Sequence, residues 1–128
     1  MRYLLDTHTL LWIVDDNPKL GEKAKSIYLN EANDIYASVA NIWEIAIKTS
    51  LNKLQIPGTL SEFVKEHVRG NKIDIMSIEL THLYQLENLT FFHRDPFDRL
   101  LIAQAIVENI PILGNDAVFD KYPIQRIW

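Results

Sequence analysis

The chain has 128 residues, of which 48% are hydrophobic, so it is long and apolar enough for one domain with its own core. It contains no cysteine, which excludes disulfides, thiolate nucleophiles and cysteine-based zinc sites and agrees with a reducing compartment. Its 17 acidic and 13 basic side chains give a net charge of −4, which argues against a broad basic face for nucleic acid. A nucleic-acid partner would need a local solution, such as carboxylates that hold divalent cations.

Short apolar runs alternate with helical patterns along the whole chain. The runs predict strands at 2–5, 34–37, 72–76, 110–113 and 124–128, the last of them at a sheet edge. Helices are expected at 10–14, 21–33, from 38 onward, at 59–69, 77–88 and 95–107. This alternation calls for right-handed crossovers and a mainly parallel sheet with helices on both faces, a three-layer α/β/α sandwich. No repeat or linker interrupts it, so we expect a single domain over residues 1–128.

The apolar runs are too short to span a bilayer, and Asp6 follows the first strand too early for a signal peptide. We therefore expect a soluble, cytoplasmic protein with no membrane partner.

Helical spacing indicates which side chains face the core. In the second, third and fifth helices these are Ala24, Ile27, Tyr28 and Ala32; Val39, Ile42, Trp43 and Ala46; and Leu80, Leu83, Tyr84 and Leu86. Glu44 and Lys48 lie four residues apart on another side of the third helix, where they could form a simple surface ion pair.

The sequence from His93 to Ala105 marks the start of a central helix. Asp95 is a typical N-cap, Pro96 suits the first helical position, and Asp98 can face unpaired backbone N–H groups. The residues that follow are apolar almost all round, which predicts a buried helix. Asp95 and Asp98 can be explained as a capping pair that favours the positive end of the helix dipole.

Acids from four separate segments are expected to meet at one edge of the sheet. Asp6 and Asp116 follow strands, Asp98 begins a helix, and Glu44 lies early in the helix after the second strand. Ligands of open α/β sheets bind at the carboxyl ends of the strands. Clustered carboxylates repel one another unless a hard cation joins them, so we expect Mg²⁺ or Mn²⁺ and phosphodiester hydrolysis. Each acid taken singly is typical of an ordinary turn or cap.

The chain resembles the PIN-domain family and, within it, VapC-like toxins of toxin–antitoxin pairs. The segments that carry the resemblance are Leu4–His8, Ser38–Ile45, Asp95–Ala103 and Leu113–Asp116 with Phe119. The resemblance implies a metal site at Asp6, Glu44, Asp98 and Asp116 and Mg²⁺- or Mn²⁺-dependent cleavage of RNA. It also implies a cognate antitoxin partner and a homodimer.

One position departs from the family pattern. The family often has Thr or Ser two residues before its last Asp, whereas this chain has Gly114. A hydroxyl contact at the site is then absent, and Asn115 is the expected partial substitute.

Neighbouring residues have accessory roles or simpler ones. Thr7 and Thr9 either orient Asp6 or cap a helix, and His8 and His93 are weaker candidates for metal or phosphate because the acids already supply ligands. Arg94 and Arg99 either hold RNA phosphates or, as we expect more, pair with neighbouring acids. Trp12, Trp43 and Phe97 are expected in the core rather than stacked on bases.

Two other functions remain open. An aspartyl-nucleophile phosphohydrolase would use Asp6 covalently, but such enzymes need a second Asp where this chain has His8. A non-catalytic α/β docking module would use the acids to bind arginines of a protein partner.

Overall fold

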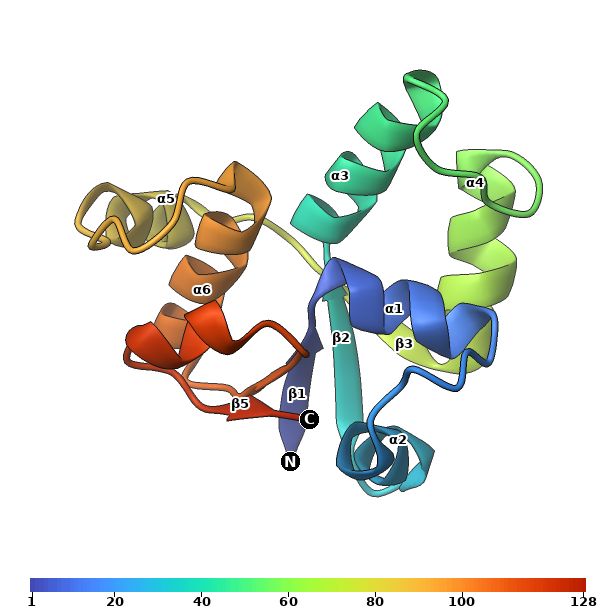
Figure 1. The fold of residues 1–128 in the computed structure, drawn as a ribbon, viewed down its shortest axis with the longest axis horizontal. Coiled ribbons are helices and arrows are strands. Elements are labelled where there is room, and N and C mark those ends of the chain that lie inside the picture. Colours follow the sequence, from blue (N-terminus) through green and yellow to red (C-terminus); the bar gives the residue numbers. More distant parts are fainter.

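The computed structural model describes residues 1–128 and contains one sheet of five parallel strands in the order β3-β2-β1-β4-β5. The strands are β1 (Arg2–Leu5), β2 (Asp34–Ser38), β3 (Ile73–Met76), β4 (Ile112–Leu113) and β5 (Arg126–Ile127). The helices are α1 (Thr7–Val14), α2 (Glu22–Leu29), α3 (Val39–Ser50), α4 (Leu60–Phe63), α5 (Leu80–Glu87) and α6 (Pro96–Glu108), and 3₁₀ turns lie at Arg69–Asn71 and Ala117–Lys121. The predicted α/β/α sandwich is confirmed (Figure 1).

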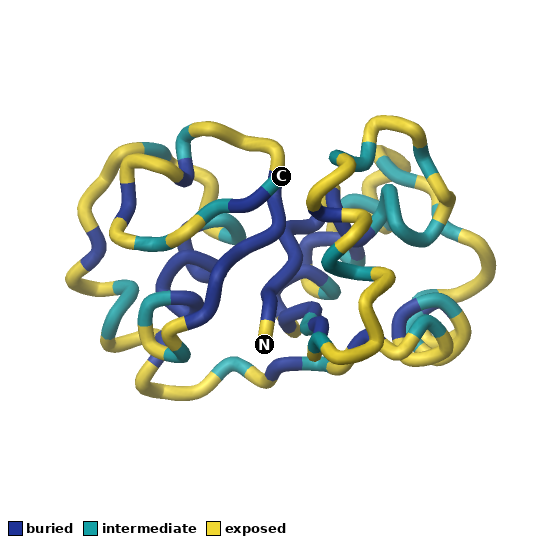
Figure 2. The backbone as a smooth tube through the Cα atoms, turned by 90° about the horizontal axis from the view of Figure 1, so that it is seen from below, coloured by how far each residue is buried: buried dark blue, intermediate teal, exposed yellow.

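Side chains of β1 alternate between two cores, as expected for a strand covered on both faces. Tyr3 and Leu5 pack in one core together with Leu10 of α1, Ala24 of α2 and Phe63 of α4. In the other core, Leu4 packs with residues of α6, among them Leu101 and Ile102. Buried segments run through the middle of the molecule and exposed ones form its outer loops (Figure 2). None of the helices combines the length and the apolar character needed to cross a membrane.

Element ends differ from the predictions where polar side chains bind the backbone. α2 ends at Leu29 rather than Asn33, because the Asn30 side chain accepts the N–H of Ala32 and leaves Ala32 exposed. α5 begins at Leu80 because His82 accepts the N–H of Glu79 in a capping box. Strands β4 and β5 are shorter than predicted, although β5 is an edge strand as expected.

The predicted 59–69 helix begins at its Thr59–Glu62 capping box, as expected. It is α-helical only to Phe63 and continues as a π-helical turn over Val64–Val68. The predicted stop at Gly70–Asn71 is confirmed by Lys72, which has a left-handed backbone with φ 61°.

The buried faces of α3 and α5 were predicted wrongly in part. On α3, Val39 and Trp43 are exposed, whereas Asn41 and Glu44 are buried. On α5, the large apolar side chains of Leu80, Leu83 and Tyr84 are exposed, and the one buried residue is His82. Both helices thus place polar side chains inside the fold and leave an apolar stripe on its surface.

Candidate active site

The strand order creates a crevice beside β1. From β1 the chain moves outward through β2 and β3, then crosses to the other side of β1 to form β4. A parallel sheet offers its ligand site where the strand order reverses, at the carboxyl ends of the strands. Asp6 follows β1 there, and Gly114 follows β4.

A polar cavity of about 190 Å³ lies at this edge. No hydrophobic residue lines it; the lining residues are Asp6, Thr7, His8, Glu44, Lys48, Asp95, Asp98 and Asp116. The structure therefore brings together the four acids named from the sequence. Two accessory candidates, Thr7 and Asp95, also line the cavity, but Asn115, Arg94 and Arg99 do not.

Asp6 is the N-cap of α1 and is buried. Its Oδ1 accepts the N–H of Thr9 at 2.8 Å. Burial raises the pKa of Asp6, and hydrogen bonds from Thr9 and the nearby His8 oppose that rise. Gly114 leaves the room that the carboxylate occupies, because a Cβ at this position would lie 2.7 Å from Asp6 Oδ2. The absent side chain at position 114 thus has a steric consequence that the sequence did not reveal.

Asp98 lies in the first turn of α6, at the positive end of the helix dipole, and Asp95 is the N-cap of the same helix. Asp95 Oδ1 accepts the N–H groups of Phe97 and Asp98 at 2.9 and 3.1 Å, which confirms its capping role. The Asp98 carboxylate itself accepts no hydrogen bond. Burial raises the pKa of Asp98 to about 7, and the charges of Asp95, Glu44, Asp6 and Asp116 add to the effect.

Glu44 is buried and held at both carboxylate oxygens. Thr7 Oγ1 donates to Oε1 at 2.7 Å, and the Lys48 ammonium lies 2.7 Å from Oε2. The ion pair considered from the sequence therefore exists, but Glu44 is only 5% exposed, so it is not a surface pair. Thr7 contacts Glu44 rather than Asp6. Asn41, which the sequence reading missed, donates to Thr7 Oγ1 at 3.0 Å; its position three residues after the Ser38 cap was the available signal.

Asp116 is exposed and caps the 3₁₀ turn that follows β4, where its Oδ1 accepts the N–H of Val118 at 3.0 Å. Asn115 is exposed, makes no side-chain hydrogen bond and lies outside the cavity lining. It therefore does not replace the missing hydroxyl in the structure.

His93 faces Asp98 from the loop before α6. The Tyr122 hydroxyl accepts the N–H groups of Phe92 and His93, and it lies 2.7 Å from His93 Nδ1. The other ring nitrogen, Nε2, is 3.7 Å from Asp98 Oδ2, which is too far for a hydrogen bond. His8, the other candidate, is exposed and stacks on Trp12.

The prediction that Arg94 and Arg99 pair with neighbouring acids is wrong. Arg99 is buried, donates to the carbonyls of Leu89 and Thr90, and lies 3.7 Å from the ring centroid of Phe91, so it holds a loop rather than an acid or a phosphate. Arg94 is exposed and has no ion pair or hydrogen bond, which rules out the expected acidic partner in this structure.

The aromatic candidates lie only partly in the core. Trp12 is partly buried and packs against Trp128, whereas Trp43 is 50% exposed and makes an edge contact with Phe97. Trp43 was therefore assigned to the core wrongly, because its helix turns its apolar stripe outward.

The donor set fits a hard divalent cation. Five of the eight residues that line the cavity are acids, and their carboxylate oxygens are ligands that Mg²⁺ and Mn²⁺ prefer. No three acidic or histidine side chains stand at the spacing of a preformed metal site. Asp6 and Asp116 each commit one oxygen to a backbone N–H group, and Asp98 commits neither. These three residues therefore keep oxygens available to a cation.

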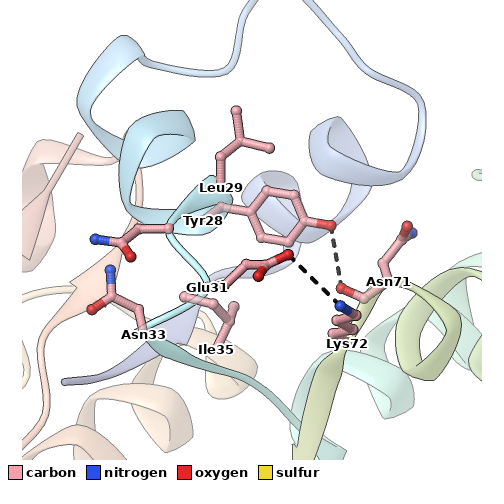
Figure 3. Close-up of a pocket in the computed structure, with 8 residues that line it drawn as sticks. Tyr28, Leu29, Glu31, Asn33, Ile35, Asn71 and Lys72 are labelled. Carbon is pink, nitrogen blue, oxygen red and sulfur yellow. Dashed lines mark hydrogen bonds and ion pairs between the residues drawn. The ribbon is translucent and has the colours of Figure 1, made fainter.

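A second cavity, of about 360 Å³, lies at the opposite edge of the sheet, where β2 and β3 begin (Figure 3). Its polar groups bind one another. Tyr28 donates to the carbonyl of Asn71 at 3.3 Å, and Lys72 lies 3.8 Å from Glu31. Glu31 is its single acid, so this cavity lacks the clustered carboxylates of the first.

Comparison with known families settles the class of the domain. The PIN domain profile matches residues 3–125. This chain belongs to the PIN domain family. Comparison with curated protein sequences finds no match.

Solved structures share this PIN fold along nearly the whole chain. VapBC2 from Rickettsia felis bound to a promoter DNA fragment is 16% identical with a TM-score of 0.68, and the match covers 99% of this chain and 98% of that one. FitAcB from Neisseria gonorrhoeae is 14% identical with a TM-score of 0.66 and coverages of 98% and 96%. A toxin–antitoxin complex from Klebsiella pneumoniae is 16% identical with a TM-score of 0.61 and the same coverages.

Proposed function

We propose that residues 1–128 form a single PIN-like domain that acts as a Mg²⁺- or Mn²⁺-dependent endoribonuclease and is the toxin of a toxin–antitoxin pair. The observation that carries this proposal is the polar cavity where Asp6, Glu44, Asp98 and Asp116 converge from four segments of the chain. Membership of the PIN domain family supports it.

The carboxylates supply what such a reaction needs from the protein. Asp6, Asp98 and Asp116 offer oxygens for a cation, and Glu44 completes the acidic site. A divalent ion held by these oxygens would supply the activation of a water for attack on the phosphodiester and the stabilisation of the leaving oxygen. Asp98 must lose its proton to take part, because burial and the neighbouring acids favour its neutral form below about pH 7.

The protein carries a net negative charge, so the phosphates of a bound RNA need positively charged side chains close to the site. Lys48, which lines the cavity, is already paired with Glu44, whereas Arg94 lies exposed just before the α6 cap without a partner. Arg94 is the phosphate contact that we propose.

The partner proposal rests on the fold neighbours and on the surface. The Klebsiella pneumoniae neighbour is a toxin–antitoxin complex. In this chain, α3 and α5 expose apolar stripes that a protein partner would cover: Val39, Trp43 and Ile47 on α3, and Leu80, Leu83 and Tyr84 on α5. We propose that these stripes form a homodimer contact and that an antitoxin silences the nuclease by inserting an Arg or Lys into the acidic cavity.

Single Asp→Asn substitutions test the nuclease. Asp6→Asn and Asp98→Asn remove a carboxylate from the cavity without changing side-chain size, so each should reduce Mn²⁺-dependent cleavage of single-stranded RNA by about 100-fold or more. Asp74→Asn is the matched control, because Asp74 is exposed on β3 and has no side-chain partner. Circular dichroism checks that all three variants fold. Full cleavage by Asp98→Asn would refute the proposal.

Calorimetric titration separates the nuclease from a docking module. A site built for Mn²⁺ takes up the ion in the absence of RNA, and Asp98→Asn should abolish that uptake. A docking surface for arginines would show no uptake that depends on the acids. Phosphoryl transfer to Asp6, detected by mass spectrometry, would instead favour the aspartyl-nucleophile reaction.

A further inference from the structure

Glu44 differs from the other acids of the cavity because both of its oxygens are engaged. Thr7 donates to Oε1 and Lys48 pairs with Oε2, each at 2.7 Å, and the Glu44 side chain is only 7% exposed. By contrast, Asp6 and Asp116 each accept one backbone hydrogen bond, at Oδ1, and Asp98 accepts none. Each oxygen of Glu44 thus already has a partner, so Glu44 offers a cation less free coordination than the three aspartates do.

A chain of hydrogen bonds holds the Thr7 side of Glu44. The backbone N–H of Ser38 donates to Asn41 Oδ1 at 2.7 Å, and Asn41 Nδ2 donates to Thr7 Oγ1 at 3.0 Å. The Thr7 hydroxyl therefore accepts from Asn41 and directs its only proton at Glu44. All members of this chain are buried, so releasing Oε1 would leave polar groups unsatisfied inside the protein.

Lys48 holds the other oxygen and is the only Lys or Arg that lines the cavity. It lies one helical turn after Glu44 on α3, and its side chain is 41% exposed. The ammonium is thus attached to the wall of a cavity that five carboxylates line. A tethered positive charge loses little entropy on pairing, unlike an ion taken from solution, and it repels a second cation nearby.

We propose that Lys48 is a built-in cation of this site, which holds Glu44 and limits the cavity to one divalent ion. This inference rests on the proposed function, and it assigns the single ion to the free oxygens of Asp6, Asp98 and Asp116. On this assignment Glu44 is a positioning residue, because it pairs with Lys48 and is not one of the residues that hold the ion.

The test counts Mn²⁺ ions bound per chain, without RNA, by calorimetry and by electron paramagnetic resonance of free Mn²⁺. Lys48→Met keeps most of the aliphatic stem and removes the charge, whereas Lys48→Arg keeps the charge. We expect one ion in the wild type and in Lys48→Arg, and two in Lys48→Met. Glu44→Gln should still bind one ion. Because Lys48 is partly exposed, the variants should fold, which circular dichroism verifies.

Two ions in the wild type, or one in a folded Lys48→Met variant, would overturn the role of Lys48 and leave the nuclease proposal standing. Loss of all Mn²⁺ binding by Glu44→Gln would show that Glu44 is a direct ligand and would also overturn the inference. If the wild type binds no Mn²⁺, the proposed function itself fails. The two failures are therefore distinguishable.

Discussion

At the scale of single residues, Asp98 couples the site to pH. Its pKa in the folded protein is about 7, against an ordinary value of 3.8, chiefly because of burial. The folded state therefore holds this proton more tightly than the unfolded chain does. The stability that the proton contributes is complete below about pH 4 and is lost as the pH rises through about 7.

Asp98→Asn keeps the residue neutral at every pH. In metal-free buffer we expect the variant to be more stable than the wild type at pH 8 by about 1–2 kcal/mol, and the difference should shrink at pH 5. Urea unfolding at the two pH values measures this. If the variant and the wild type differ in stability by the same amount at both pH values, Asp98 does not titrate in this range.

The same proton competes with a metal ion. Cleavage by the wild type should therefore rise as the pH increases through about 7, since Asp98 must be ionised to bind the cation. Cleavage rates between pH 5.5 and 8.5 at a fixed, subsaturating Mn²⁺ concentration test this, with the range chosen around that pKa. A rate that falls with increasing pH over this range would contradict the assignment.

Gly114 sets the position of Asp6 by having no side chain. A Cβ there would lie 2.7 Å from Asp6 Oδ2, so Gly114→Ala must move a carboxylate that the α1 cap holds in place. We expect a loss of Mn²⁺ affinity of about tenfold or more, because misplaced ligands weaken metal binding. Gly70→Ala is the control, since its Cβ would meet only the Lys65 carbonyl at 3.5 Å. Calorimetry measures the Mn²⁺ affinity of both variants. Equal affinities would contradict the steric role of Gly114.

At the scale of elements, a buried polar network joins α5 to α6. His82 accepts the N–H of Glu79 at 2.9 Å, and its Nε2 lies 3.1 Å from Glu108 of α6. Gln104 of α6 lies 3.4 Å from His82 and accepts a hydrogen bond from Ser38, the N-cap of α3. The network thus links α5 to the helix that carries Glu44.

His82→Leu would leave the partners of His82 unpaired inside the fold. We expect a loss of about 2–3 kcal/mol in the free energy of unfolding, measured by urea denaturation. His67→Leu serves as the comparison, because His67 is partly buried and its side chain makes no hydrogen bond. A change below about 0.5 kcal/mol in His82→Leu would show that the network adds little to stability.

At the scale of the whole molecule, the outward apolar stripes of α3 and α5 bear on assembly. Trp43, half-exposed on α3, should lie in the proposed homodimer contact. Trp43→Glu places a charge there and should convert a dimer to a monomer in light scattering at matched concentration. Ser26→Glu on α2 introduces the same charge elsewhere on an exposed helix and should leave the mass unchanged. A wild type that is monomeric at every concentration would contradict the dimer.

Local chemistry in the sequence predicted the architecture and the place of the site. The Asp95 cap with Pro96 begins α6, and the Thr59–Glu62 capping box begins α4, because these signals act between residues that are near neighbours in the chain. The alternation of strands and helices implied a parallel sheet, which brings Asp6 and Asp116 to one edge whatever the details of packing.

The orientation of α3 and α5 depended on contacts between distant segments. Periodicity places apolar side chains inside, yet Glu44 is buried with a hydrogen bond from the distant Thr7, and His82 is buried because Glu108 and Gln104 satisfy it. Gly114 shows the same dependence, since its effect on Asp6 arises only when β1 and β4 pair. A polar side chain can be buried when partners meet it, and those partners are assembled by folding rather than by proximity in the chain.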